Sequence, residues 1–216
     1  MNILCYGDSN TYGYNPADGM RYPEEIRWPC VLRSLLPASD RLIEEGCNGR
    51  TAAFTPEDEV WKDGRSYLPA CLNSHKPLDL VILMLGSNDL KRRFCASPED
   101  IAGGIQEHLD IISDFMMLKQ GFRPRVLLIS PPLIGEGITQ SVFSDNFDAD
   151  AVDRSMKLAP LYRSLADSFT ESGRLQCDFL DAAQLIEPSA IDSLHLMPDA
   201  HRTLAEAVAS WIAANR

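Results

Sequence analysis

Two short runs of this chain, Leu78 to Leu85 and Arg125 to Ser130, are almost uniformly apolar. A strand with one face in water alternates apolar and polar side chains, whereas a strand covered on both faces has no reason to alternate. The two runs therefore predict strands inside a parallel sheet that carries helices on both faces. This requirement restricts the chain to the α/β class of folds.

Other segments extend this pattern to five strands and five long helices. The remaining strands are predicted at Ile3–Tyr6, Arg41–Glu45 and Cys177–Leu180. Helices are predicted at Glu24–Leu36, Ser66–Ser74, Pro98–Lys119, Ala151–Ser172 and Pro198–Ala214. About 30 to 40 residues separate most successive strands, which is enough for one crossover helix with its loops. We therefore expect a three-layer α/β/α fold with a five-stranded parallel sheet in the flavodoxin-like order 2-1-3-4-5.

The bulk properties of the chain limit its partners. A length of 216 residues fits a single domain, residues 1–216. The net charge of -11, without a basic stripe, argues against a nucleic-acid partner. No apolar stretch could span a bilayer and no signal peptide is visible, so we expect a cytoplasmic protein without a membrane partner. The six cysteines show no CxxC motif or Cys/His ligand spacing, so we expect reduced thiols and no metal site.

Polar residues follow the first three predicted strands, at the edge where α/β proteins place their sites. Ser9 ends the motif Gly7-Asp8-Ser9 after the first strand, Gly49 follows the second strand, and Asn88 follows the third. Acyl transfer needs a nucleophilic hydroxyl beside donors aimed at the oxygen that becomes negative. Ser9 would be the nucleophile, and the backbone N–H groups of Ser9 and Gly49 with the Asn88 amide would form the oxyanion hole. As alternatives, these residues would only cap helices or shape turns.

A serine nucleophile also needs a base, and His195 is the best candidate. It lies just before the last predicted helix, with Asp192 three residues earlier. A carboxylate at that spacing can accept the Nδ1 proton and leave Nε2 basic. His201 is a weaker candidate, because the start of a helix disfavours an imidazolium. Asp8 and Asp181 remain alternative partners for the histidine.

These motifs, in this order along the chain, resemble those of the SGNH hydrolases, also called the GDSL esterase family. The matching residues are Ser9, Gly49, Asn88, Asp192 and His195. Similarity to the bacterial arylesterase and acyltransferase subgroup comes from Glu44-Glu45-Gly46, Arg50-Thr51, Ser66-Tyr67-Leu68-Pro69, Leu78-Asp79-Leu80-Val81-Ile82 and Ser130-Pro131-Pro132. The resemblance implies hydrolysis of short acetyl and aryl esters, and acyl transfer to alcohols or hydrogen peroxide. It also implies homo-oligomers whose contacts narrow the active-site entrance.

The chain departs from the family pattern at three positions. Asn10 replaces the leucine of the usual GDSL motif, Ser87 replaces a frequent threonine, and Tyr12 replaces a tryptophan of the subgroup. Tyr12 and Trp28 are candidates for the wall of the substrate pocket. The segment 131–150 is the longest predicted loop and a candidate lid or specificity region.

The leading hypothesis is a serine esterase that needs no cofactor and acts on small-molecule esters through an acyl-enzyme on Ser9. A carbohydrate O-acetyl esterase with the same residues is the first alternative. A second alternative, from another class, is a non-catalytic flavodoxin-like module that binds a nucleotide or flavin at the same sheet edge. That alternative lacks a GxGxxG loop after the first strand and leaves the Asp192-to-His195 motif unexplained.

Overall fold

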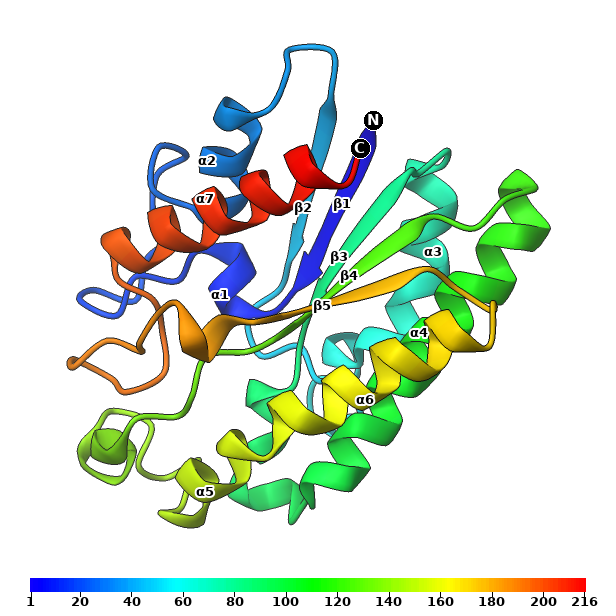
Figure 1. The fold of residues 1–216 in the computed structure, drawn as a ribbon. Helices are drawn as coiled ribbons and strands as arrows, with labels where there is room; N and C mark the ends of the chain where they lie inside the picture. The colour runs from blue at the N-terminus through cyan, green and yellow to red at the C-terminus, as the bar shows by residue number, and fades with distance from the viewer.

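Five parallel strands form one sheet in the computed structural model, which describes residues 1–216. The strands are β1 (Asn2–Gly7), β2 (Arg41–Gly46), β3 (Leu80–Met84), β4 (Arg125–Ser130) and β5 (Cys177–Asp181). They lie in the order β2-β1-β3-β4-β5, which confirms the order predicted from the sequence. Helices lie on both sides of the sheet, so the three-layer α/β class is confirmed as well (Figure 1).

The helices bury one apolar core against each face of the sheet. On one face lie α2 (Trp28–Leu35) and α7 (Pro198–Ala214), which pack against each other. On the other face lie α3 (Gly64–His75), α4 (Pro98–Gln120) and α6 (Leu158–Glu171). The core under α2 and α7 contains 17 buried residues and the core under the other three helices contains 31. Burial of each large apolar side chain contributes about 1.5 to 3 kcal/mol, so the sheet is a firm base for the loops at its edges.

Prolines account for two differences between the predicted and observed helices. The helix predicted at Ala151–Ser172 is divided into α5 (Asp150–Met156) and α6. Pro160 has no N–H to donate to the carbonyl of Met156, so the first helix ends there. Pro29 fits only in a first turn, and α2 therefore starts later than the predicted Glu24.

The longest helix, α4, has clear start and stop signals. The Ser97 side chain accepts from the Asp100 backbone, and the Asp100 side chain accepts from the Ser97 backbone, which forms a capping box. Gly121 ends the helix in the left-handed conformation. Neither α4 nor any other helix is long and apolar enough to cross a membrane.

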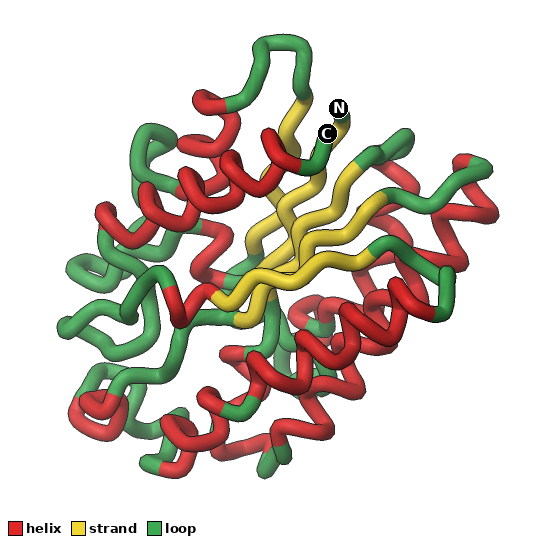
Figure 2. Tube along the Cα trace, in the orientation of Figure 1, coloured by secondary structure: helices red, strands yellow, loops and turns green.

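The carboxyl ends of the strands gather the loops that carry the predicted site residues. Gly7 lies opposite both Gly46 and Met84 in the sheet register, so the segments after β1, β2 and β3 leave the sheet side by side. Figure 2 shows many loops gathered beyond this end of the sheet, on the left of the view. The segment between β5 and α7 reaches the same edge, where it hydrogen-bonds to Asn10 of α1 (Ser9–Tyr12).

Candidate active site

The turn after β1 holds Ser9 at the start of α1. Gly7 packs so closely that a Cβ atom there would lie 2.1 Å from Thr11 Oγ1, which only glycine avoids. Asp8 then caps the helix, and its carboxylate accepts a hydrogen bond of 3.0 Å from the backbone N–H of Asn10. Ser9 is nearly buried and lines a pocket at the sheet edge.

The structure brings Ser9, His195 and Asp192 into one hydrogen-bonded chain. The Ser9 Oγ lies 2.9 Å from His195 Nε2, and His195 Nδ1 lies 2.6 Å from Asp192 Oδ2. Because a carboxylate only accepts, Nδ1 carries the proton and Nε2 presents a lone pair to the hydroxyl. The imidazole is therefore oriented to remove a proton from Ser9.

Asp192 is fully buried, and its carboxylate accepts four hydrogen bonds. Besides His195, the carboxylate accepts hydrogen bonds from the Leu194 N–H (3.0 Å), the His195 N–H (2.9 Å) and the Ser189 hydroxyl (2.8 Å). Burial alone would raise the pKa of Asp192, but the hydrogen bonds and charge of His195 and the Ser189 bond hold it below its ordinary value. The carboxylate therefore remains ionised and can stabilise an imidazolium.

The alternative acid and base residues lie elsewhere. Asp181 accepts a hydrogen bond of 3.0 Å from the Ser130 hydroxyl, and Asp8 caps α1, and neither carboxylate is hydrogen-bonded to His195. His201 is buried in the fold, where it accepts a hydrogen bond from the backbone of α2, and burial lowers its pKa to about 4. His201 is thus neutral, and no hydroxyl is hydrogen-bonded to its ring.

The three residues predicted to form the oxyanion hole, Ser9, Gly49 and Asn88, all line the same pocket. The backbone N–H groups of Ser9 and Gly49 donate to no other protein group. Gly49 has a φ of 80°, a left-handed conformation that favours glycine. The Asn88 side-chain amide donates to the Arg50 carbonyl at 3.1 Å, while its contact with Asp8 is long, at 3.5 Å. One amide proton of Asn88 is therefore only weakly engaged.

Arg50 ties two of these loops together, and sequence reasoning did not assign it this role. Its Nη1 atom donates to the carbonyl of Gly7 at 2.8 Å and also to the carbonyl of Glu45. The guanidinium carbon lies 4.1 Å from the centre of the Tyr6 ring. Because Arg50 directly follows Gly49, these contacts hold the donor loop against the end of β1.

Two buried carboxylates support the turns without contacting the histidine. Asp89 accepts hydrogen bonds of 2.8 Å from the backbone N–H groups of Ala52 and Ala53, which fastens the loop after β2 to the turn after β3. Burial raises the pKa of Asp89 and of Asp8 to about 6. Asp8 thus fixes the turn after β1, and Asp89 fixes the loop after β2 against the turn after β3.

Asn10 connects the nucleophile turn to the histidine loop. Its side-chain amide donates to the Leu194 carbonyl at 3.4 Å, and its Oδ1 atom accepts from the Leu196 N–H at 3.2 Å. These contacts bracket His195 on both sides. The signal in the sequence was a polar residue directly after the serine, where the resemblance expects leucine.

Aromatic and apolar side chains line the pocket beside the serine, which has a volume of about 170 Å³. The Tyr14 ring lies 4.1 Å from the His195 ring, and the Phe143 ring lies 5.4 Å from it. Leu194 completes this apolar wall. Phe143 belongs to the 131–150 loop, which therefore contributes to the shape of the pocket.

The sequence predicted that Tyr12 and Trp28 form the wall of the substrate pocket, but neither residue lines the pocket beside Ser9. Trp28 is the first residue of α2 and is fully buried in the core beneath α2 and α7. The Tyr12 ring lies under the Arg21 guanidinium, 4.4 Å away. The short turn of α1 instead leaves Tyr14 beside His195.

Two lysines complete the pocket. Lys62 forms an ion pair with Glu59, whereas Lys91 forms no salt bridge. Burial and the positive charges of Arg93 and Lys62 lower the pKa of Lys91 to about 8. The pocket thus combines an apolar wall with an unpaired, half-buried ammonium group.

Comparison with known families gives one match over most of the chain. The family model described as the GDSL-like lipase/acylhydrolase family matches residues 5–203. No curated protein matches the chain.

Solved structures of similar proteins cover nearly the whole chain. An aryl esterase of M. smegmatis is 34% identical, with a TM-score of 0.89 and coverage of 99% of this chain and 98% of the other. Est24, a carbohydrate acetylesterase from Sinorhizobium meliloti, is 33% identical, with a TM-score of 0.88 and the same coverage. A putative arylesterase from Agrobacterium tumefaciens is 33% identical, with a TM-score of 0.85 and the same coverage.

Proposed function

Because the chain belongs to the GDSL-like lipase/acylhydrolase family, we propose that it hydrolyses short-chain esters through an acyl-enzyme on Ser9. As a member of that family, with esterase neighbours, the chain is a carboxylic ester hydrolase. The observation that carries the residue assignment is the chain of contacts from Asp192 through His195 to Ser9, at 2.6 and 2.9 Å.

In the proposed acylation, the Ser9 oxygen attacks the ester carbonyl carbon while His195 Nε2 takes the hydroxyl proton. The carbonyl π electrons move to the oxygen, which becomes negative. When the tetrahedral intermediate collapses, the bond to the alcohol oxygen breaks and His195 returns its proton to that oxygen. Asp192 stabilises the imidazolium between the two steps.

Deacylation follows the same steps, with water in place of Ser9 as the nucleophile. His195 removes a proton from water, and the resulting hydroxide oxygen attacks the acyl carbon. Collapse of the second intermediate releases the carboxylic acid, and Ser9 regains its proton. The N–H groups of Ser9 and Gly49, with the amide of Asn88, would donate to the oxyanion in both steps. The two free N–H groups support this role.

The small pocket favours short acyl groups. A volume of about 170 Å³ is below the range typical of sites for drug-sized ligands. Aryl acetates and acetylated sugars are the two candidate substrate classes, in line with the aryl esterase and the carbohydrate acetylesterase among the neighbours. The aromatic wall of Tyr14 and Phe143 favours an aryl ester, and acyl transfer to alcohols or hydrogen peroxide is proposed as a side activity.

A panel of p-nitrophenyl esters of increasing acyl length, together with acetylated xylooligosaccharides, tests this proposal. We expect the highest kcat/KM for the acetyl ester, a steep decline with longer chains, and slower release of acetate from the sugars. Faster deacetylation of the sugars would favour the carbohydrate esterase instead. A fluorophosphonate probe should label Ser9, and an unlabelled protein without esterase activity would support the non-catalytic alternative.

We also propose a homo-oligomer in the cytoplasm. Val60 and Trp61 are 59% and 60% exposed and directly precede the pocket residue Lys62, so a second copy could cover them. All six cysteines are free, which is typical of a reducing compartment. Light scattering of the purified protein would measure its mass, and a monomer at micromolar concentration would contradict the oligomer.

A further inference from the structure

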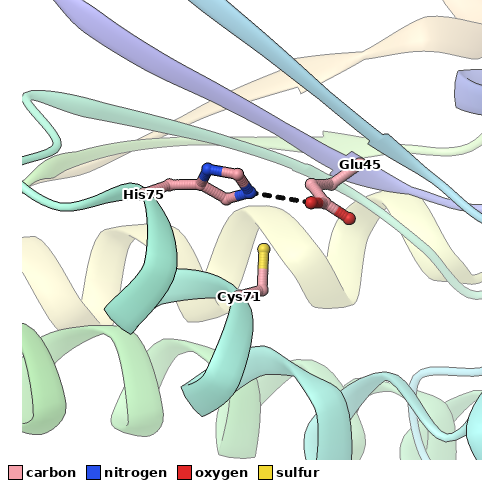
Figure 3. Close-up of side chains that lie close together, drawn as sticks. All are labelled: Glu45, Cys71 and His75. Carbon is pink, nitrogen blue, oxygen red and sulfur yellow. Dashed lines mark hydrogen bonds and ion pairs between the residues drawn. The ribbon is translucent and has the colours of Figure 1, made fainter.

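A second histidine–carboxylate pair lies outside the proposed active site, and a thiol points at it. The Oε1 atom of Glu45, near the end of β2, lies 2.8 Å from the Nε2 atom of His75 in α3. The Sγ atom of Cys71, also on α3, points toward the space beside this pair (Figure 3). The carboxylate oxygen, the ring nitrogen and the sulfur all lie within 4.8 Å of one another. We call these three residues the β2–α3 cluster.

The fold makes this convergence rigid. Residues four apart share one face of a helix, so Cys71 and His75 both project from α3 in the same direction. Glu45 approaches from a different element, which is fixed in the sheet by its pairing with β1. Cys71 is buried, whereas the side chains of Glu45 and His75 are 19% and 23% exposed. The cluster therefore has a buried base and an opening to solvent.

We propose that Glu45, Cys71 and His75 bind one zinc-type divalent cation. One sulfur, one imidazole nitrogen and one carboxylate oxygen are the donor types that Zn²⁺ takes in proteins. Tetrahedral bonds of about 2.0 to 2.3 Å place ligand atoms about 3.3 to 3.8 Å apart. The three donor atoms lie within 4.8 Å of one another, so small side-chain movements would bring them to that spacing, and the 2.8 Å contact between Glu45 and His75 would open to admit the ion.

Binding leaves a balanced charge at the cluster. The Cys71 thiol releases a proton to solvent and binds as the thiolate. His75 binds as the neutral imidazole with its proton on Nδ1, so that the Nε2 lone pair is free for the cation. The charges of the thiolate and the Glu45 carboxylate together equal that of the divalent ion. The exposed side of the cluster allows a water molecule to complete four ligands. The Tyr67 hydroxyl, 3.3 Å from the other oxygen of Glu45, would hold that carboxylate in place.

The proposed ion would join β2 to α3 directly before the loop that contains Gly49. Glu45 stands next to Gly46, and its carbonyl accepts a hydrogen bond from Arg50. A metal at this position would stabilise the folded protein and would lie outside the pocket that contains Ser9. The proposal is therefore independent of the esterase assignment.

Cobalt(II) provides a test that does not depend on activity. Protein stripped with EDTA and dialysed would be titrated with Co²⁺ while its absorption spectrum is measured. We expect one equivalent to bind and to produce an intense near-ultraviolet band from thiolate-to-cobalt charge transfer. Calorimetry should give one Zn²⁺ per chain, and Zn²⁺ should displace the cobalt spectrum.

Variants locate the site. Cys71→Ser should abolish the charge-transfer band, and His75→Gln should weaken Co²⁺ binding by about 100-fold or more. Cys95→Ser is the matched control, because Cys95 is an exposed free cysteine outside the cluster. Circular dichroism would show that each variant is folded. A missing band in the unmodified protein, or a band that survives Cys71→Ser, would overturn the proposal, and the Glu45–His75 contact would then be only an ion pair.

Discussion

The protein contains two histidine–carboxylate pairs of similar geometry and different surroundings. In the active-site pair, His195 lies 2.6 Å from Asp192 and its other nitrogen faces Ser9. In the β2–α3 cluster, His75 lies 2.8 Å from Glu45 and a thiol is nearby. Both pairs therefore combine a carboxylate, an imidazole and a side chain of nucleophilic type.

The surroundings decide which of the two pairs is suited to acyl transfer. The active-site pair lies at the carboxyl ends of the strands, where free N–H groups and a pocket adjoin the hydroxyl. In the β2–α3 cluster the carboxylate and the thiol share one side of the histidine, and burial raises the pKa of Cys71 to about 12. A thiol in that state is a poor nucleophile. A histidine–carboxylate pair alone is thus insufficient evidence for catalysis, and the predictions below test the contrast.

The largest expected effect is that of Ser9→Ala. Removal of the hydroxyl removes the nucleophile, so kcat for p-nitrophenyl acetate should fall by about 10⁴-fold or more, measured by release of p-nitrophenol. Ser87→Ala is the matched control, because Ser87 is a buried serine at the same sheet edge whose hydroxyl has no hydrogen-bond partner. It should retain kcat within a few-fold. Substantial activity of Ser9→Ala would mean that another residue attacks the ester.

Asp192→Asn should have the next largest effect. The amide would no longer hold the His195 tautomer or stabilise its charged form, and kcat should fall by about 10³- to 10⁴-fold with little change in KM. Steady-state kinetics with p-nitrophenyl acetate measures both parameters. An unchanged kcat would show that His195 works without its carboxylate, and the pairing of the two groups would then have no part in catalysis.

Much of this contrast could be predicted from the sequence, because its parts are local. The strand runs, the turn at Ser9 and the short spacing from Asp192 to His195 all act within a few residues, and the 2-1-3-4-5 order then joins them. The β2–α3 cluster was missed, since Glu45 reaches α3 only through tertiary packing. For the same reason the sequence could not show that Phe143 lies beside the histidine.

The pocket itself distinguishes the two pairs further, because it contains the unpaired Lys91 ammonium. An ester with a carboxylate on its leaving group should gain about 1 kcal/mol from this charge, which is about fivefold in kcat/KM. We therefore expect Lys91→Met to lower kcat/KM for 4-acetoxybenzoate about fivefold relative to the neutral 4-acetoxybenzamide. Lys157→Met, a lysine outside the pocket, is the control. Equal losses for both esters would assign Lys91 to packing.

The pH dependence of this preference follows from the lowered pKa of Lys91. Below a pKa of about 8 the ammonium is charged and attracts the anion, and above it the amine is neutral. The charged groups around the ammonium are Asp8, Asp89, Lys62 and Arg93. The two carboxyl groups, with pKa values of about 6, are already ionised near pH 8. The ratio of kcat/KM for 4-acetoxybenzoate to kcat/KM for 4-acetoxybenzamide should therefore fall as the pH rises through 8. A constant ratio would contradict this role.

The smallest expected effect is that of Glu45→Gln on the metal-free protein. Partly exposed ion pairs contribute about 0.2 to 1 kcal/mol, so urea unfolding in EDTA should show a loss of less than about 1 kcal/mol. Removal of one partner from a fully buried pair such as Asp192 with His195 costs about 3 to 5 kcal/mol. With Zn²⁺ at 100 times its Kd, the unmodified protein should gain about 2.7 kcal/mol, and the variant should gain less because one ligand is missing. A loss of several kcal/mol without metal would instead make Glu45 a structural charge like Asp192, and the two pairs would then contribute similarly to the stability of the fold.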